Sequence, residues 1–364
     1  MKISTFNVLV LTGLVIIGTQ GCKKDSKQTA PNDLALSGKN LSTSLSSAST
    51  DYTVTTLAGG EDPGFADGYN TKARFSFPAE MLGSDGYLYL VDLGNNAIRK
   101  MKISDRLVST LAGGTAGYAD GAKGNAKFNS PRGIALGPDN NFYVTDYYNF
   151  KIRKVSRAGL VSTYAGLDSG YVDGPINKAK FGYITAITFS KDGSMYIYDN
   201  SASKIRKITR GGIVSTFAGS TRGNADGTLQ TAQFSGISNM TFASDGTLYT
   251  TGDRLRKISP AGIVSTIDVH VGASNDQFPA GILLTSRGTI FITDAGSGEL
   301  LRVTSAGVIT HVAGIPNAHS RETPDDGVGL DARFANPTSI VLYDNNLYIS
   351  ENFEIAKVTL PNSY

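Results

Sequence analysis

The segment Val161-Ser-Thr-Tyr-Ala-Gly166 and its copies decide how this chain folds. The copies are VTTLAGG at 54–60, VSTLAGG at 108–114, VSTFAG at 214–219, VSTI at 264–267 and VITHVAG at 308–314. Successive copies begin 54, 53, 53, 50 and 44 residues apart. Self-similarity at a fixed period of about 50 residues is typical of solenoids and propellers.

The residues between two copies predict three further strands. After the segment comes a long loop with Asp-Gly, then a short apolar stretch such as GIAL at 133–136. A turn leads to the alternating stretch NFYVTD at 141–146, and a second turn leads to IRKV at 152–155. Four short strands per repeat, joined by turns, are typical of a propeller blade. We therefore predict an all-β chain folded as a six-bladed β-propeller.

The stagger of the repeats predicts how the ring closes. The first recognisable element, Val54–Leu57, has no strands before it, and the last set of three strands has no fourth strand after it. We expect Val54–Leu57 to complete the last blade, which would leave no free sheet edge. Residues 51–364 then form a single propeller domain.

The stretches at 141–146 and 152–155 resemble the NHL-repeat family, and the resemblance extends over residues 54–358. It implies a propeller fold but is a poor guide to function. The Asp-Gly loop before Ala-x-Phe resembles a subgroup found in secreted and lipid-anchored bacterial proteins.

The amino terminus resembles the leader of a bacterial lipoprotein. Lys2 is followed by an apolar run at 8–17 that is too short to span a membrane, and Gly21 precedes Cys22, the only cysteine of the chain. We expect residues 1–21 to be a signal peptide and Cys22 to carry acyl chains, palmitate among them. Residues 22–50 read as a flexible tether because they are rich in Ser, Thr, Lys and Asn. The alternative is an ordinary signal peptide followed by a free cysteine.

The start of the tether, CKKDSK at 22–27, resembles lipoproteins of Bacteroidota. This resemblance implies an outer-membrane lipoprotein, displayed on the cell surface rather than on the periplasmic side. Lys and Arg number 34 against 31 Asp and Glu, without a basic patch, so we expect no nucleic-acid partner. We expect the protein to be a monomer.

Charged residues that recur in five of the six blades predict structure rather than chemistry. Asp at the end of the second strand and Arg in the third predict five ion pairs: Asp92–Arg99, Asp146–Arg153, Asp199–Arg206, Asp253–Arg256 and Asp294–Arg302. The Asp-Gly loops are interpreted as tight turns. Calcium binding in one of these loops stays open, although none has the dense acidic spacing of a calcium cage. We predict no metal ligands and no cofactor.

Residues that break the repeat are the candidates for ligand binding, and the long loops that carry them should share one face. The second blade offers Tyr147, Tyr148 and Phe150 in its loop between the second and third strands, and Phe353 holds a comparable position in the sixth. Arg132 and Glu80, near the start of innermost strands, stand where other blades have mostly small residues. The structural alternative is that the aromatic rings pack under loops and that Arg132 pairs with Glu80.

These features favour a non-catalytic binding module for a glycan, a peptide or a partner protein, acting through the long-loop face. Two alternatives remain: a metal-dependent lactonase or lyase with its site in the central channel, and a structural subunit of an outer-membrane complex. No catalytic residue is predicted, because neither a G-x-S-x-G nor an H-E-x-x-H motif is present.

Overall fold

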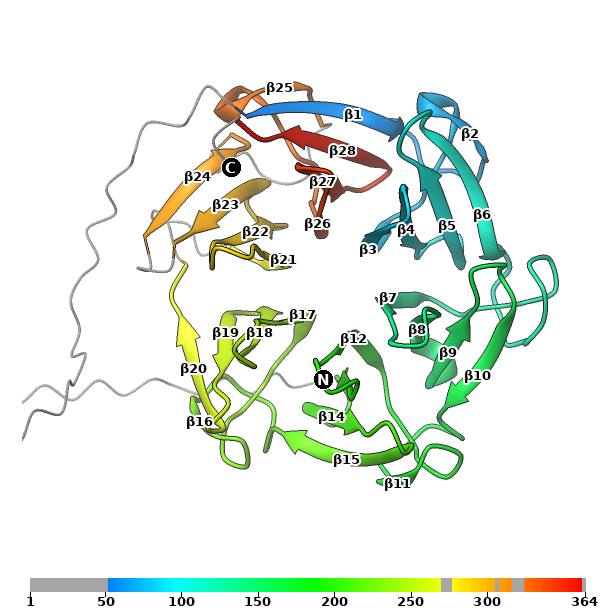
Figure 1. Ribbon diagram of the computed structural model, residues 1–364, viewed down its shortest axis with the longest axis vertical. Helices are drawn as coiled ribbons and strands as arrows, with labels where there is room; N and C mark the ends of the chain where they lie inside the picture. The colour runs from blue at the N-terminus through cyan, green and yellow to red at the C-terminus, as the bar shows by residue number, and fades with distance from the viewer. Residues whose placement is uncertain (1–51, 270–276, 305–307, 316–323, 362–364) are drawn as a thin grey trace, which may run out of the picture. The chain divides into compact units, whose positions relative to one another are not determined.

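The computed structural model describes residues 52–269, 277–304, 308–315 and 324–361. In these ranges the strands form six antiparallel sheets arranged around a central axis (Figure 1). The chain is therefore an all-β, six-bladed β-propeller, as the repeat predicted. Cys22, the signal peptide at 1–21 and the tether at 22–50 lie outside the described residues.

The first three blades follow the chain from the axis outward. The first contains β3 (Pro78–Ser84), β4 (Tyr87–Asp92), β5 (Ala97–Lys102), β6 (Leu107–Gly113) and the outlying β2 (Gly68–Tyr69). The second contains β7 (Pro131–Leu136), β8 (Phe142–Asp146), β9 (Lys151–Val155) and β10 (Val161–Ala165). The third contains β12 (Ile184–Phe189), β13 (Met195–Asp199), β14 (Lys204–Ile208), β15 (Ile213–Ala218) and β11 (Gly174–Pro175).

The last three blades repeat this order, and the first strand of the fold joins the last of them. The fourth contains β17 (Ile237–Phe242), β18 (Leu248–Gly252), β19 (Leu255–Ile258), β20 (Ile263–Ile267) and β16 (Gly227–Thr228). The fifth contains β21 (Pro279–Leu284), β22 (Ile290–Asp294), β23 (Glu299–Val303) and β24 (Ile309–Ala313). The sixth contains β26 (Ser339–Tyr343), β27 (Asn346–Ser350), β28 (Glu354–Thr359), β1 (Thr53–Gly59) and β25 (Gly327–Val328). β1 pairs antiparallel with β28, with Val54 opposite Val358.

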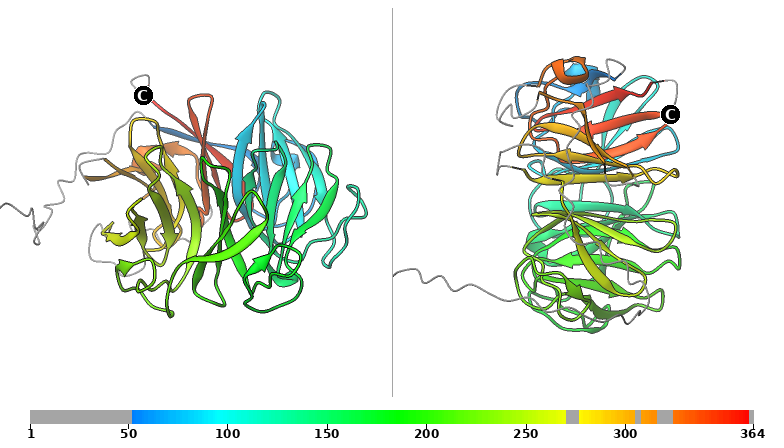
Figure 2. Two further views of the ribbon diagram at one scale, coloured as in Figure 1. Left: turned by 60° about the horizontal axis from the view of Figure 1, so that its bottom comes forward. Right: turned by 90° about the vertical axis from the view of Figure 1, so that its left-hand side faces the viewer.

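Helical structure in the described residues is limited to three 3-10 turns: η1 (Asn70–Lys72), η2 (Tyr147–Asn149) and η3 (Gly329–Asp331). Within the described part of the chain, no helix has the length and apolar character needed to cross a membrane. The side views in Figure 2 show the blades packed face to face around the ring, with loops at both of its faces.

The hydrophobic core lies between neighbouring blades. Val91 and Ile98 of the first blade, for example, share one buried cluster with Phe142 and Val144 of the second. This follows from the sequence, because strands with apolar residues on both faces can be buried on both sides.

In the second, fourth and sixth blades, a hydroxyl group of the second strand also links the blade to the next. Thr145 Oγ1 donates to the Thr185 carbonyl at 2.9 Å, Thr251 Oγ1 to the Ala280 carbonyl at 2.5 Å, and Ser350 Oγ to the Ala79 carbonyl at 2.8 Å. These bonds fix the innermost strands, whose first residues surround the central channel.

Candidate functional site

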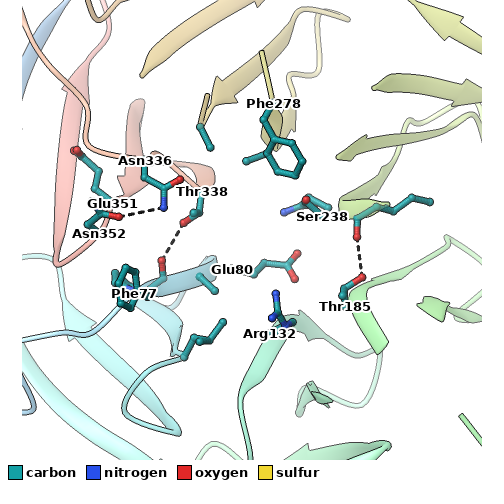
Figure 3. A pocket seen from close by; sticks show the side chains of 17 residues that line it. Phe77, Glu80, Arg132, Thr185, Ser238, Phe278, Asn336, Thr338, Glu351 and Asn352 are labelled. Carbon is teal, nitrogen blue, oxygen red and sulfur yellow. Dashed lines mark hydrogen bonds between the residues drawn. The ribbon is translucent and has the colours of Figure 1, made fainter. Parts of the chain in front are cut away.

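A cavity of about 410 Å³ opens at the centre of the ring (Figure 3). It lies at the end of the channel where the loops before the innermost strands meet the loops after the second strands. All six blades contribute to its wall, which is apolar at Phe77, Leu93, Ile237 and Phe278. A volume of this size and a mostly apolar wall with a few polar groups are typical of a small-ligand site.

Glu80, on β3, is an acid of this cavity, and its side chain is half-buried in the wall. Its Oε2 accepts a hydrogen bond from the Ile134 N–H at 3.0 Å, and Asn239 of the fourth blade also donates to its side chain. Burial raises the pKa of Glu80 to about 8, although both hydrogen bonds act in the opposite direction. The carboxyl group is therefore mostly protonated at neutral pH.

Gly133 makes room for this arrangement. A Cβ atom at position 133 would lie 2.9 Å from Glu80 Oε2 and 2.7 Å from the Thr185 carbonyl oxygen. Real Cβ atoms do not approach so closely, so a side chain here would displace the acid or the backbone of the third blade. The residue that aligns with Glu80 in the second blade is thus a glycine for a steric reason.

Arg132, on β7, points into the same cavity but takes its main contact from an aromatic ring. Its guanidinium carbon lies 4.2 Å from the centre of the Tyr147 ring, a cation–π distance. Among the described residues, Arg132 Nε is buried without a hydrogen-bond partner. The recorded partners of Glu80 are Ile134 and Asn239, so the alternative in which Arg132 pairs with Glu80 does not describe the structure.

The aromatic residues of the second blade gather beside Arg132. The ring of Tyr147 stacks on Tyr183 at 4.7 Å and meets Tyr148 edge-on at 4.9 Å, while Phe150 lies 5.3 Å from Tyr183. Tyr148 and Tyr183 are 49% and 37% exposed. The structure thus brings Tyr147, Tyr148 and Phe150 together and leaves part of the cluster open to solvent.

Phe353 lies elsewhere on the rim. Its ring packs edge-on against Phe77 at 5.3 Å, and Phe77, itself 49% exposed, lines the cavity. Phe353 therefore contacts a residue of the cavity wall but does not line the cavity itself.

Three aromatic residues near the cavity were not predicted: Phe77, Tyr183 and Phe278. All three directly precede an innermost strand, and the equivalent residues of the other blades are Ser130, Gly236 and Asn336. This position breaks the repeat as clearly as those of Glu80 and Arg132, and it lies two residues before the aligned position of Arg132 and three before that of Glu80. The signal was present in the sequence.

The second blade also carries the family match. Residues 128–155, which include β7, β8 and β9, match the NHL repeat family. The second blade thus carries an NHL repeat within a six-bladed propeller.

Two curated proteins resemble parts of this chain. Protein SUPPRESSOR OF QUENCHING 1 of Arabidopsis thaliana is 34% identical over 136 residues, which is 34% of this chain and 13% of that protein. NHL repeat-containing protein 2 of Gallus gallus is 34% identical over 87 residues, which is 24% of this chain and 12% of that protein. The chain thus matches only about an eighth of the length of either relative.

Solved structures share the fold at low identity. An auxiliary nutrient binding protein from Bacteroides ovatus superposes with a TM-score of 0.64 at 15% identity, covering 85% of this chain and 76% of that one. Virginiamycin B lyase of Staphylococcus aureus gives 0.53 at 14% identity, covering 85% and 99%. A gluconolactonase of Xanthomonas campestris gives 0.55 at 12% identity, covering 79% and 87%. At such identities the likeness concerns the fold alone.

The recurring Asp and Arg of the propeller form buried networks in the first three blades. Arg153 Nη1 bonds to Asp146 at 2.6 Å, Arg99 Nη1 to Asp92 at 2.6 Å and Arg206 Nη1 to Asp199 at 3.5 Å. Each arginine is fully buried. These groups belong to the scaffold.

The expected pairs of the fourth and fifth blades differ from the structure. Thr250 lies opposite Arg256, so Gly252 occupies the position of the repeated aspartate, while Asp253 lies exposed in the following loop. In the fifth blade Leu301 occupies the register of the repeated arginine, and Arg302 lies one position further along, opposite Phe291. The Oδ1 atom of Asp294 instead accepts backbone N–H groups of Phe278, Gly296 and Ser297.

The aspartates of the Asp-Gly loops do more than form local turns, because they also bond to other strands of their blades. Asp120 pairs with Arg153 at 2.6 Å and accepts both the N–H and the hydroxyl of Thr163, the threonine of the VST motif. The same bonds recur at Asp67, Asp173 and Asp226, the last of which is the ion-pair partner of Arg256. Each aspartate thus ties its long loop to the third and fourth strands of its blade, which explains why threonine recurs in the motif.

The sixth blade keeps the acids of this network but not the arginine. Ala356 stands at the arginine position, and Thr56 of β1 donates its N–H to Asp326 and its hydroxyl to Glu354. Burial, together with the charge of Glu354, raises the pKa of Glu351 well above its usual value. Burial and the charges of Asp326 and Glu61 raise the pKa of Glu354 to about 7. Across the described residues, no three His, Cys, Asp or Glu side chains gather in a way that could hold a metal ion.

Proposed function

We propose that this NHL propeller is a non-catalytic binding module that holds a small ligand in the cavity at the long-loop end of its central channel. The observation that carries the proposal is a cavity with apolar walls whose one arginine, Arg132, also contacts a partly exposed aromatic cluster beside the cavity. Flat rings next to polar groups suit the faces of sugars or the side chains of a peptide.

The structural neighbours support a binding role. One of them is named an auxiliary nutrient binding protein, and its fold covers 85% of this chain. Together with the lipoprotein-like leader at Cys22, this favours a module anchored to the outer membrane and displayed at the cell surface. Two acyl chains are enough for stable anchoring.

The melting temperature of the purified protein tests the proposal against panels of oligosaccharides and peptides. A ligand present at 100 times its Kd stabilises the fold by about 2.7 kcal/mol, which is readable as a shift. Tyr148→Ala should abolish the shift. Tyr69→Ala is the matched control, because Tyr69 is 52% exposed but lies in the outlying strand β2. A shift that survives Tyr148→Ala would exclude this face as the site.

Glu80 is the one observation that favours the enzymatic alternative. A carboxyl group with a pKa of about 8 inside a cavity can give or take a proton near neutral pH. Hydrolysis of lactones, or elimination from a cyclic ester, that is lost in Glu80→Gln but retained in Tyr69→Ala would establish catalysis. Absence of turnover with ligands that bind would leave the binding function.

A further inference from the structure

Arg132 differs from the other arginines that lie against aromatic rings in this propeller. Arg153 also lies over rings, those of Tyr118 and Phe128, but its two Nη atoms bond to two aspartates and two backbone carbonyls. For Arg132 the recorded contact is the ring of Tyr147. Its guanidinium therefore rests on this ring at the cavity wall, and its Nε atom is buried without a hydrogen-bond partner among the described residues.

The other titratable groups on the cavity wall do not neutralise this charge. They are Glu80 and Glu351, whose carboxyl groups come from the first and sixth blades. Glu80 already accepts from Ile134 and Asn239, and Glu351 accepts from the Ala335 N–H. Burial raises the pKa of both groups, to about 8 for Glu80, and so disfavours their charged forms. Arg132 is the one basic residue among the described residues that line the cavity.

We infer that the cavity selects a saccharide that carries a carboxylate, of the uronic-acid class, and that Arg132 binds this carboxylate. The planar guanidinium can form two parallel hydrogen bonds to a carboxylate, and such bonds are strong where water is largely excluded. The exposed rings of Tyr148 and Tyr183 beside it offer flat faces for the sugar ring. This inference rests on the proposed binding function and names its ligand class.

Isothermal titration calorimetry on the purified full-length protein tests the inference with matched probes. The first pair is trigalacturonate and its methyl ester, which differ in the charge of the same carboxyl groups. A neutral trisaccharide and a short peptide with acidic side chains complete the set. We expect trigalacturonate to bind at least tenfold more tightly than its ester and than the other two probes.

Variants test whether Arg132 itself contributes to the affinity for trigalacturonate. Arg132→Met should cost at least tenfold in affinity for trigalacturonate, and Arg132→Lys should cost less because it keeps the charge. Arg157→Met is the matched control: the Arg157 guanidinium also lies over a ring, that of Phe142 at 4.6 Å, but it bonds to Asn140 and Asp85 in turns outside the cavity. It should leave the affinity unchanged, with melting temperatures confirming that every variant is folded.

Three results would overturn the inference in distinguishable ways. If the acid and its ester bind equally, the cavity does not select a carboxylate, and the binding function stands. The same conclusion follows if the neutral trisaccharide binds and its binding is lost with Tyr148→Ala but not with Arg132→Met. Tighter binding of the acidic peptide would keep Arg132 and replace the ligand class. No binding of any probe would refute the inference and also count against the proposed function.

Discussion

Replacing Glu80 with glutamine should make the propeller more stable, and increasingly so as the pH rises. The carboxyl group has a folded pKa of about 8 against an ordinary value of 4.5, because burial disfavours its charge. Between these values the native state keeps a proton that the unfolded chain releases, so wild-type stability falls as the pH rises. Glutamine keeps the shape of the side chain and an oxygen that can accept from the Ile134 N–H, but it does not titrate.

The size of the effect follows from the pKa shift. One pKa unit corresponds to about 1.4 kcal/mol. The stability difference between Glu80→Gln and wild type should therefore grow by up to about 1.4 kcal/mol per pH unit from pH 4.5 to pH 8, and then level off. At pH 7 it should reach about 2–3 kcal/mol, once the partial exposure of Glu80 to the channel is allowed for.

Urea unfolding of both proteins at several pH values between 4 and 9 measures this difference. Glu351 and Glu354 also have raised pKa values, but they titrate in both proteins and largely cancel in the comparison. A difference that is independent of pH, or one that shrinks as the pH rises, would refute a buried, protonated Glu80. It would also remove the charge argument for the acidic ligand.

Three further changes test the scaffold around the site. Arg153→Met should lower the free energy of unfolding by about 3–5 kcal/mol, because it leaves Asp146 buried without its cation. Lys102→Met, at an exposed ion pair, should cost less than about 1 kcal/mol. If urea unfolding gives similarly small losses for both variants, Arg153 does not belong to a stabilising network. Gly133→Ala should cost about 1–3 kcal/mol because its Cβ would meet Glu80 and the Thr185 carbonyl, whereas Gly124→Ala, at a position with open space, should be nearly neutral. Glu354→Gln should gain stability relative to wild type between pH 4.5 and about pH 7, the range set by its ordinary and folded pKa values, and no further above it. Melting temperatures at pH 5 and pH 8 check this, and equal differences at both would count against the raised pKa.

The Asp–Arg networks show which ion pairs a sequence repeat can predict and which it cannot. In the first three blades the spacing of Asp and Arg is constant, so comparing blades was enough to pair Asp146 with Arg153. In the fourth blade Gly252 adopts a φ of +145° at the end of β18, and the loop to β19 is short. Asp253 consequently falls outside the register, and only the pairing of Thr250 with Arg256 reveals this.

For the candidate site, the sequence identified residues but not their interactions. Glu80, Arg132 and the aromatic residues of the second blade could be found because they break the repeat. Their interactions could not, because the partners come from other blades or loops: Asn239 bonds to Glu80, and Tyr183 stacks on Tyr147. A comparison of equivalent positions identifies unusual residues but does not measure distances between them.

The sequence by itself determined the blade architecture, the number of blades and the face that carries the long loops. It could do so because each blade is specified by local strand patterns and turns that recur along the chain. The tertiary structure decided the protonation of Glu80, the isolation of Arg132 and the role of Asp120 and its equivalents. These properties depend on burial and on contacts between residues more than 30 positions apart, such as Asp120 with Arg153, which exist only once the strands have packed into a ring.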